Sequence, residues 1–171
     1  GNISVGGSGK TPAVEWLIDR LRTVGLQPGI ISRGYGGEEK GPALVKPDDD
    51  PARVGDEPLL LAQRCQCPVA ICADRIAAGR LLLAQYPHCD VIVSDDGLQH
   101  YRLHRDVEIA VVNQRVLGNQ RLLPAGPLRE PVVRLAGVDA VFAHGPLAPE
   151  VLRQLGRVPV FKMSLSGQML K

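Results

Sequence analysis

Hydrophobic positions along the chain follow two kinds of pattern. Short runs rich in β-branched residues, typical of strands, alternate with longer stretches in which apolar residues recur every three or four positions, as on one face of a helix. The expected strands are residues 3–5, 29–32, 68–72, 90–94, 107–112, 140–143 and 158–163, and the expected helices are residues 14–24, 57–64, 74–85 and 149–155. The alternation predicts an α/β fold, a mostly parallel sheet with helices on both faces.

Two segments interrupt this alternation and have no periodicity. Residues 33–55 are rich in glycine, proline and aspartate, the residues of turns, and residues 118–131 are rich in proline and glycine. We expect both to be irregular, and the first to be a long surface loop. Long loops in compact domains are usually functional or disordered.

Composition bounds the class of protein. The chain has 171 residues, of which 44% are hydrophobic and 22% charged, which predicts one globular domain over residues 1–171. A net charge of +2 is too small to indicate a nucleic-acid partner. No apolar run approaches the ~20 residues that span a bilayer. The chain opens at Gly1 without an initiator methionine, so we expect a fragment of a longer protein.

The four cysteines are spaced unlike a metal site or a secreted disulfide framework. Cys65, Cys67, Cys72 and Cys89 contain no C-x-x-C pair. Their spacing favours free thiols in a reducing compartment over a structural zinc site.

The string GGSGKT at residues 6–11 lies between a predicted strand and a predicted helix, which is the context of a phosphate-binding loop. Glycines let backbone N–H groups turn toward anionic oxygens, and the following helix adds its positive dipole end. Lys10 would reach the β- and γ-phosphates, and the Thr11 hydroxyl would bind Mg²⁺. The strict motif has glycine where this chain has Ser4. The alternative is a glycine-rich turn that only starts a helix.

Two aspartates follow a hydrophobic strand. Residues 91–94 read VIVS and run directly into Asp95 and Asp96, which we expect at the carboxyl edge of the sheet, where Walker-B carboxylates meet Mg²⁺ or its water. Adjacent residues of a strand point to opposite faces, so we expect one of the two to contact the metal directly. The alternative is an acidic turn through Gly97.

Two further residues have both a structural and a catalytic interpretation. His100 follows this acidic turn and is either a hydrogen-bonding surface residue or an active-site group. Asp56 stands behind Gly55 at the start of a predicted helix. It is either the helix cap or a base that activates an acceptor.

Five motifs, taken in order, resemble the tetraacyldisaccharide 4′-kinase family, whose members phosphorylate a lipid disaccharide in lipid A synthesis. The motifs are GNISVGGSGKTP at residues 1–12, SRGYGG at 32–37, GDEP at 55–58, SDDGLQH at 94–100 and LLPAGPLREP at 122–131. They cover residues 1–131, and the remainder offers no motif.

The resemblance implies roles at matching positions. The phosphate loop is Ser4, Val5, Gly6, Gly7, Ser8, Gly9, Lys10 and Thr11, with Ser4 as an ordinary variant. The metal ligands are Thr11, Asp95 and Asp96, and the catalytic residues are Lys10, Asp56, Asp96, His100 and Glu130, with Asp56 as the base. Arg33 is a candidate for phosphate or substrate contact.

The resemblance also implies the reaction and its setting. A P-loop NTPase-like kinase would use ATP and Mg²⁺ to phosphorylate the 4′-hydroxyl of a tetraacyl disaccharide at the cytoplasmic side of the bacterial inner membrane. It would reach the membrane through regions missing here, without a nucleic-acid partner. The family's amino-terminal hydrophobic helix and its smaller carboxy-terminal domain, which holds a histidine assisting the base, have no counterpart in this sequence. Whether the chain alone is active therefore stays open.

Two other classes of protein remain as alternatives. A P-loop ATPase or GTPase of the partitioning or metal-insertion class often has a signature lysine where this chain has Val5, and a GTPase would need an NKxD string. A non-catalytic nucleotide-binding module would keep the fold without the chemistry.

Overall fold

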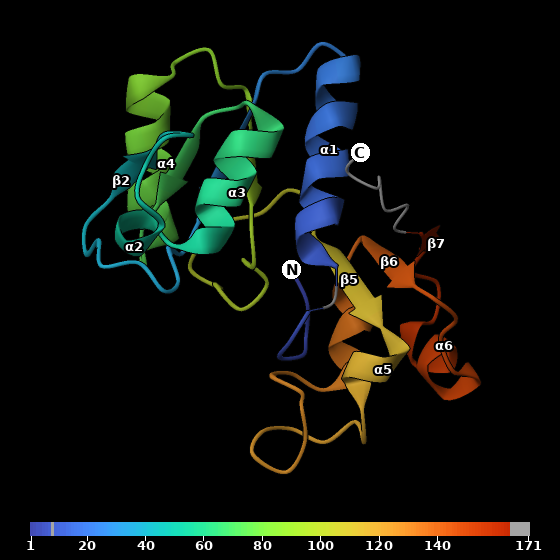
Figure 1. Cartoon of the computed structure of the whole chain (residues 1–171). Coiled ribbons are helices and arrows are strands. Elements are labelled where there is room, and N and C mark those ends of the chain that lie inside the picture. The colour runs from blue at the N-terminus through green and yellow to red at the C-terminus, as the bar shows by residue number, and fades with distance from the viewer. Residues whose placement is uncertain (8, 165–171) are drawn as a thin grey trace, which may run out of the picture. The chain divides into compact units, whose positions relative to one another are not determined.

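The chain forms two compact units (Figure 1). The computed structural model describes residues 1–7 and 9–164. One unit combines Gly1–Pro12 with the described part of Arg105–Lys171, and the other is Ala13–His104. Helix α1 (Lys10–Thr23) begins in the first unit and continues into the second. Each unit has its own sheet.

The sheet of the second unit has the strand order β2-β3-β1-β4. Its strands are β1 (Pro28–Ser32), β2 (Ala43–Val45), β3 (Val69–Ile71) and β4 (Val91–Ser94). Its helices besides α1 are α2 (Pro51–Val54), α3 (Asp56–Cys65) and α4 (Arg75–Gln85). Strand β1 runs parallel to both β3 and β4, while β2 pairs antiparallel with β3 at one edge. The carboxyl ends of the three parallel strands therefore share one edge.

Helices cover both faces of this sheet. Ile30 packs in one cluster with Ile18 of α1 and Leu61 of α3, whereas its neighbour Ile31 packs in another with Leu82 of α4. All five side chains are at most 1% exposed. Burying each contributes roughly 1.5–3 kcal/mol. Burial on both faces explains why these strands read as continuous hydrophobic runs.

The segment 33–55 is not entirely irregular, contrary to the expectation of one long loop. Asp50 caps α2 by accepting a 2.9 Å hydrogen bond from the Ala52 N–H, and Pro51 supplies the fixed φ of a first helical position. Strand β2 has three residues and depends on its pairing with β3. Both elements are too short for a periodic pattern to reveal.

The first unit contains a wholly parallel sheet in the order β5-β6-β7. Its strands are β5 (Ile109–Asn113), β6 (Ala140–His144) and β7 (Val160–Met163). Its helices are α5 (Gln114–Leu117), the 3₁₀ helix η1 (Val132–Gly137) and α6 (Pro149–Leu155). The amino-terminal segment pairs with β5, since the Val111 N–H donates 2.8 Å to the Gly1 carbonyl oxygen. Within residues 3–5, however, only Ser4 forms a bridge, with Leu128.

The α/β class with mostly parallel sheets flanked by helices is confirmed, and the main predicted helices and strands are present within a few residues. The short elements β2, α2, α5 and η1 were not expected. The four cysteines are free thiols, as the spacing indicated. No helix within the described ranges combines the length and the apolar character needed to cross a bilayer. That residues 1–171 are one P-loop kinase domain of a longer protein stays a prediction.

Candidate functional site

The glycine loop of the first unit leads directly into α1. Gly6 has φ +98° and Gly9 has φ +88°, values that favour glycine because a Cβ atom would strain the backbone. Lys10 is the first residue of α1 and Thr11 the second, so both belong to the first helical turn, at the positive end of the helix dipole. Ser8, predicted to line the loop, lies outside the described residues.

Backbone hydrogen bonds join the glycine loop to the segment that carries the fifth motif. The Val5 N–H donates 2.9 Å to the Pro127 carbonyl oxygen, and the Arg129 N–H donates 2.7 Å to that of Ile3. Between these bonds Ser4 forms a bridge with Leu128, whose side chain is fully buried. Backbone hydrogen bonds thus hold the first motif against the fifth, which sequence order alone did not predict.

Glu130 is held in place by charge. Its Oε2 lies 3.4 Å from Nε of Arg134. The Nη2 of the same arginine lies 2.6 Å from Oε2 of Glu108. Arg105 contacts the other oxygen of Glu108 at 2.8 Å. The Glu130 side chain is 13% exposed, so this chain of ion pairs orients a carboxylate that still touches solvent. Glu130 and the glycine loop belong to the same unit.

The acidic turn of the second unit follows β4. Asp95 is 1% exposed and accepts a 3.3 Å hydrogen bond from the Ser32 hydroxyl at Oδ2. Its N–H donates to the Ile31 carbonyl oxygen, extending the β1–β4 pairing by one residue. Asp96 is half-buried and has φ +47°, the left-handed region. Strained backbone of this kind clusters at functional sites. The two carboxylates therefore occupy different environments.

Arg75, which the sequence did not single out, joins this acidic turn. It is the first residue of α4 and only 4% exposed, and its Nη1 donates 2.9 Å to the Cys72 carbonyl oxygen. Burial lowers the pKa of its guanidinium, an effect opposed by the negative charges of Asp95 and Asp96. The sequence held one signal for Arg75: it directly follows Asp74, the expected start of a helix, just after a hydrophobic strand.

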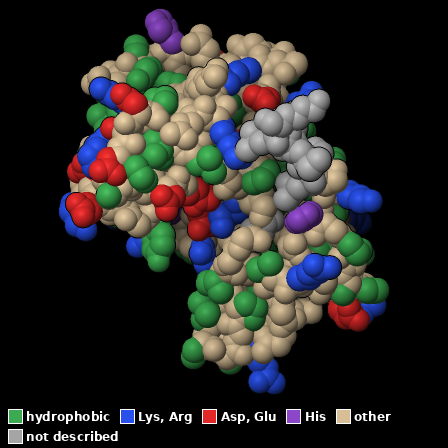
Figure 2. Space-filling model, viewed as in Figure 1, with side chains coloured by type: hydrophobic (Ala, Val, Ile, Leu, Met, Phe, Trp, Pro, Cys, Tyr) green, Lys and Arg blue, Asp and Glu red, His purple; other side chains and the backbone are tan. Residues whose placement is uncertain are grey.

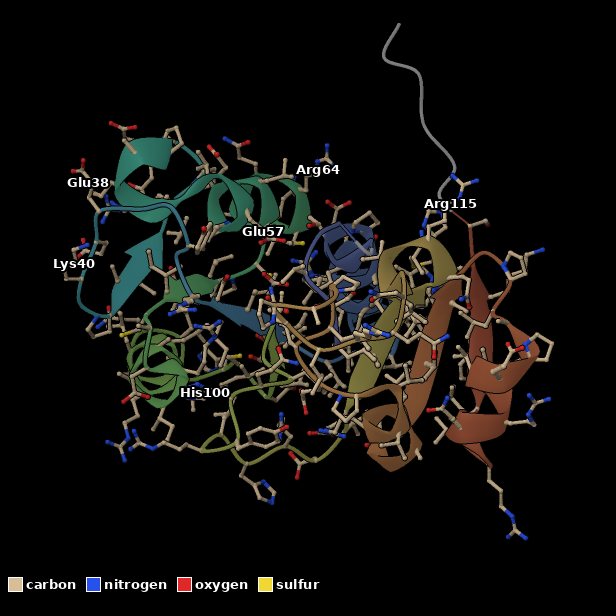
Figure 3. The ribbon with its side chains drawn as sticks, turned by 90° about the horizontal axis from the view of Figure 1, so that it is seen from below. Glu38, Lys40, Glu57, Arg64, His100 and Arg115 are labelled. Carbon is tan, nitrogen blue, oxygen red and sulfur yellow. The ribbon has the colours of Figure 1, made fainter. Side chains whose placement is uncertain are left out.

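His100 lies in the loop after β4 (Figure 3). Its backbone N–H donates 2.9 Å to the Gly97 carbonyl oxygen, which closes a second turn, residues 97–100, directly after the acidic one. Its Nε2 is buried and has no hydrogen-bond partner among the described residues. Buried polar atoms are normally paired, so this nitrogen is available to a ligand or a water molecule.

The second and third motifs meet through their glycines. Gly55 has φ +91°, and a Cβ atom there would lie 2.5 Å from the Tyr35 carbonyl oxygen. A Cβ atom at Gly37 would lie 2.6 Å from the Arg53 carbonyl oxygen. This close backbone approach requires glycine at both positions. It sets the loop that carries Arg33, which is exposed, against the start of α3.

Asp56 does not cap α3. Gly55 occupies the cap position, no side chain caps the helix there, and Asp56 is the first helical residue. The cap interpretation is therefore wrong. A carboxylate in the first turn is still favoured by the helix dipole, and its catalytic role remains a prediction.

The predicted residues thus fall into two groups. The glycine loop, Lys10, Thr11 and Glu130 belong to the first unit, and Arg33, Asp56, Asp95, Asp96 and His100 belong to the second. Within the described residues no cluster of three or more histidine, cysteine or acidic side chains forms a ready metal site. On the face drawn in Figure 2, basic side chains are interspersed with acidic ones.

Comparison with known proteins decides the family. A family model described as Tetraacyldisaccharide-1-P 4′-kinase matches residues 1–170. The chain belongs to this kinase family. The resemblance of the five motifs is thereby confirmed over almost the whole chain, including the part after residue 131 that offered no motif.

Individual relatives carry the name of the same kinase. The chain is 62% identical over 167 residues to the tetraacyldisaccharide 4′-kinase of Aromatoleum aromaticum, covering 98% of this chain and 50% of that protein. It is 59% identical over 152 residues to the enzyme of the same name from Halorhodospira halophila, covering 88% and 46%. This member of the kinase family thus spans about half the length of the curated relatives it matches.

A solved structure shows the same fold. The crystal structure of an "apo" form of LpxK from Aquifex aeolicus in complex with ATP superposes with a TM-score of 0.81 at 36% identity. The match covers 95% of this chain and 51% of that one. The α/β arrangement of this family member is therefore that of a known kinase over nearly all of its length.

Proposed function

We propose that the whole protein is an ATP-dependent kinase that transfers the γ-phosphoryl group to the 4′-hydroxyl of a tetraacyl lipid A disaccharide precursor. The observation that carries the proposal is the family match over residues 1–170. The glycine loop supports it, because positive-φ glycines opening a helix suit a phosphate-binding function. The named activity of the relatives and the ATP in the Aquifex structure support the donor and the acceptor.

In this proposal the first unit binds the nucleotide phosphates. Amides of the loop after Val5, whose own N–H is bonded to Pro127, would donate hydrogen bonds to phosphate oxygens, and Lys10 would neutralise charge that develops during transfer. Phosphoryl transfer depends mostly on positioning and charge neutralisation, which such a loop supplies. Glu130, oriented by Arg134, is a further acidic residue of this group.

Thr11, Asp95 and Asp96 are the proposed residues for Mg²⁺. Hydroxyl and carboxylate oxygens are the ligands this hard cation prefers, so the donor set fits it. When bound, the cation would neutralise phosphate charge. Because Asp95 is buried and already accepts from Ser32, we assign the more direct contact to Asp96, whose side chain is half-buried.

Asp56 is the proposed base that accepts the proton of the acceptor hydroxyl. Its place at the first position of α3, no longer explained by capping, is consistent with this role. His100, with its buried unpartnered Nε2, is the proposed neighbour that orients a polar group by a hydrogen bond. Arg33 is exposed on a glycine-fixed loop and is proposed to contact a phosphate or the substrate.

A lipid acceptor implies work at a membrane. We therefore infer that the whole protein acts at the cytoplasmic face of a bacterial inner membrane, with no nucleic-acid partner. In this proposal the lipid disaccharide is the substrate, and the membrane is a partner because it holds that lipid.

The test measures phosphate transfer from ATP by the purified whole protein with and without the lipid disaccharide. The proposal predicts ATP consumption that depends on the acceptor and is lost in Lys10→Ala. Hydrolysis independent of acceptor would instead favour a P-loop ATPase or GTPase. Nucleotide binding without turnover would favour a non-catalytic module, and near-normal transfer by Lys10→Ala would contradict the role of the loop.

A further inference from the structure

Three of the four cysteines gather at the amino edge of the second unit's sheet. Cys65 is the last residue of α3, Cys67 stands two residues before β3, and Cys89 stands two residues before β4. Because β3 and β4 run parallel to β1, these positions share the edge opposite to Asp95. A modification here would leave the acidic turn untouched.

The backbone between Cys65 and Cys67 brings them into disulfide range. Gln66 has φ 50° and ψ 37°, the left-handed counterpart of a helical residue. A helical residue of either hand separates its two neighbours by about 5.4 Å, from a Cα radius of about 2.3 Å and a rise of about 1.5 Å per residue. Disulfides join Cα atoms about 4.4–6.8 Å apart. No large backbone movement is needed to join the pair.

The pKa values of the two thiols are shifted in opposite directions. The interaction between the two neighbouring thiols raises the pKa of Cys65 and lowers the pKa of Cys67. The guanidinium of Arg22 also favours the Cys67 thiolate, and its Nη2 is fixed by a 2.7 Å hydrogen bond to the Gln66 carbonyl oxygen. Glu15, on the same helix as Arg22, further opposes ionisation of Cys65. Arg64, labelled in Figure 3 near the end of α3, pairs with Glu15 at 3.1 Å.

Access also differs between the thiols. Cys65 is 2% exposed and belongs to the core cluster with Ile18 and Leu61, while Cys67 is half-buried at the margin of that cluster. A reagent in solution therefore reaches Cys67 first. Cys89 is also half-buried, but burial raises the pKa of its thiol, so it offers a matched comparison.

We propose that Cys65 and Cys67 are a thiol pair that low-molecular-weight disulfides oxidise reversibly, with Cys67 as the nucleophile and Cys65 as the resolving thiol. The Cys67 thiolate attacks one sulfur of the reagent, forming a mixed disulfide and releasing one thiolate. Cys65 then loses its proton and attacks the Cys67 sulfur, which releases the second thiolate. The protein loses two protons and two electrons, and the reagent gains them as two thiols. The proposal does not depend on the proposed kinase activity.

The experiment treats the full chain with oxidised glutathione under native conditions and follows intact mass and peptide fragmentation. The wild-type chain should lose the mass of two hydrogen atoms, with the bond between Cys65 and Cys67, and dithiothreitol should reverse it. Cys65→Ala should stop at a stable glutathione adduct on Cys67. Cys67→Ser should react at least about tenfold more slowly, since the thiolate is the nucleophile.

Matched controls are Cys89→Ser and Cys72→Ser, which should oxidise at the wild-type rate. Alkylation of the wild-type chain by iodoacetamide should begin at lower pH for Cys67 than for Cys89, because the thiolate of Cys67 persists to lower pH. The proposal is overturned if the wild-type chain keeps four free thiols while folded, if glutathione attaches first to Cys89, or if the adduct on Cys67 never resolves to a disulfide. The wild-type readouts decide this even if a variant fails to fold.

Discussion

The hydroxyl of Ser32, at the end of β1, donates a hydrogen bond of 3.3 Å to the Oδ2 of Asp95, the residue that follows β4. Both side chains are at most 4% exposed. The bond joins the second motif to the fourth across neighbouring parallel strands. It fixes the more buried of the two aspartates and leaves Asp96 as the one closer to solvent.

Removing this hydroxyl should destabilise the second unit. Ser32→Ala leaves a buried carboxylate with one partner fewer, and we expect the free energy of unfolding to fall by about 1–3 kcal/mol. Urea denaturation followed by circular dichroism measures it. Thr23→Ala, which removes an exposed hydroxyl bonded to the Asp19 carbonyl oxygen, should cost less than half as much. Equal losses in the two variants would show that the Ser32–Asp95 bond has no special weight.

The contact between the second and third motifs can be tested with two glycines that share a positive φ. Gly55 has φ +91° and Gly36 has φ +84°, so alanine strains the backbone at either position, by about 1–2 kcal/mol. Only at Gly55 would the new Cβ atom also overlap the Tyr35 carbonyl oxygen, at 2.5 Å, whereas nothing lies within 4 Å at Gly36. Gly55→Ala should therefore be less stable than Gly36→Ala by about 1–3 kcal/mol in thermal or urea unfolding. Equal stabilities of the two variants would mean that the loops carrying Tyr35 and Gly55 can separate freely.

The Asp49–Arg53 pair gives a pH-dependent prediction. The hydrogen bond from Arg53, 2.7 Å long, lowers the pKa of the Asp49 carboxyl. A depressed folded-state pKa contributes stability above the unfolded pKa, near 3.9, and that stability is lost as the pH falls through the lower folded value. Asp49→Asn keeps an acceptor for the Lys46 N–H but removes the charge. The variant should melt at a slightly lower temperature than wild type at pH 7, and the difference should close as the pH falls through the lowered folded-state pKa of Asp49. If the difference in melting temperature persists unchanged in acid, it comes from packing and not from the charge of Asp49.

Sequence reasoning identified the parts that depend on local chemistry. A helix directly after the glycine loop, expected from residue 14 and observed from Lys10, follows from the spacing of apolar residues, and the two aspartates after β4 follow from a hydrophobic run ending in acidic residues. The local pattern gave only a weak signal for Arg75, because an arginine at the start of a helix is usually exposed. Its burial depends on the Cys72 carbonyl oxygen and on Asp95, which lies 20 residues further along the chain.

Backbone context also decided the cases where sequence reasoning was wrong or incomplete. Asp56 reads as a helix cap, but Gly55 takes the cap position with a φ of +91° that no local pattern specifies. Strand β2 exists only through its pairing with β3, and the bridge between Ser4 and Leu128 joins residues 124 positions apart. Pairings over such separations leave no periodic trace in the sequence.

The central claim is that the loop ending at Lys10 and Thr11 binds the phosphates of a nucleotide, and equilibrium titration of the full chain with Mg-ATP tests it most directly. Lys10→Ala should weaken ATP binding about 10–100-fold, the value of a charge-assisted hydrogen bond of about 1.5–3 kcal/mol. The same variant should leave the weaker binding of AMP nearly unchanged, and Lys46→Ala, at a lysine outside the loop, should bind ATP like wild type. Equal ATP affinity in the wild-type chain and in Lys10→Ala would contradict the account.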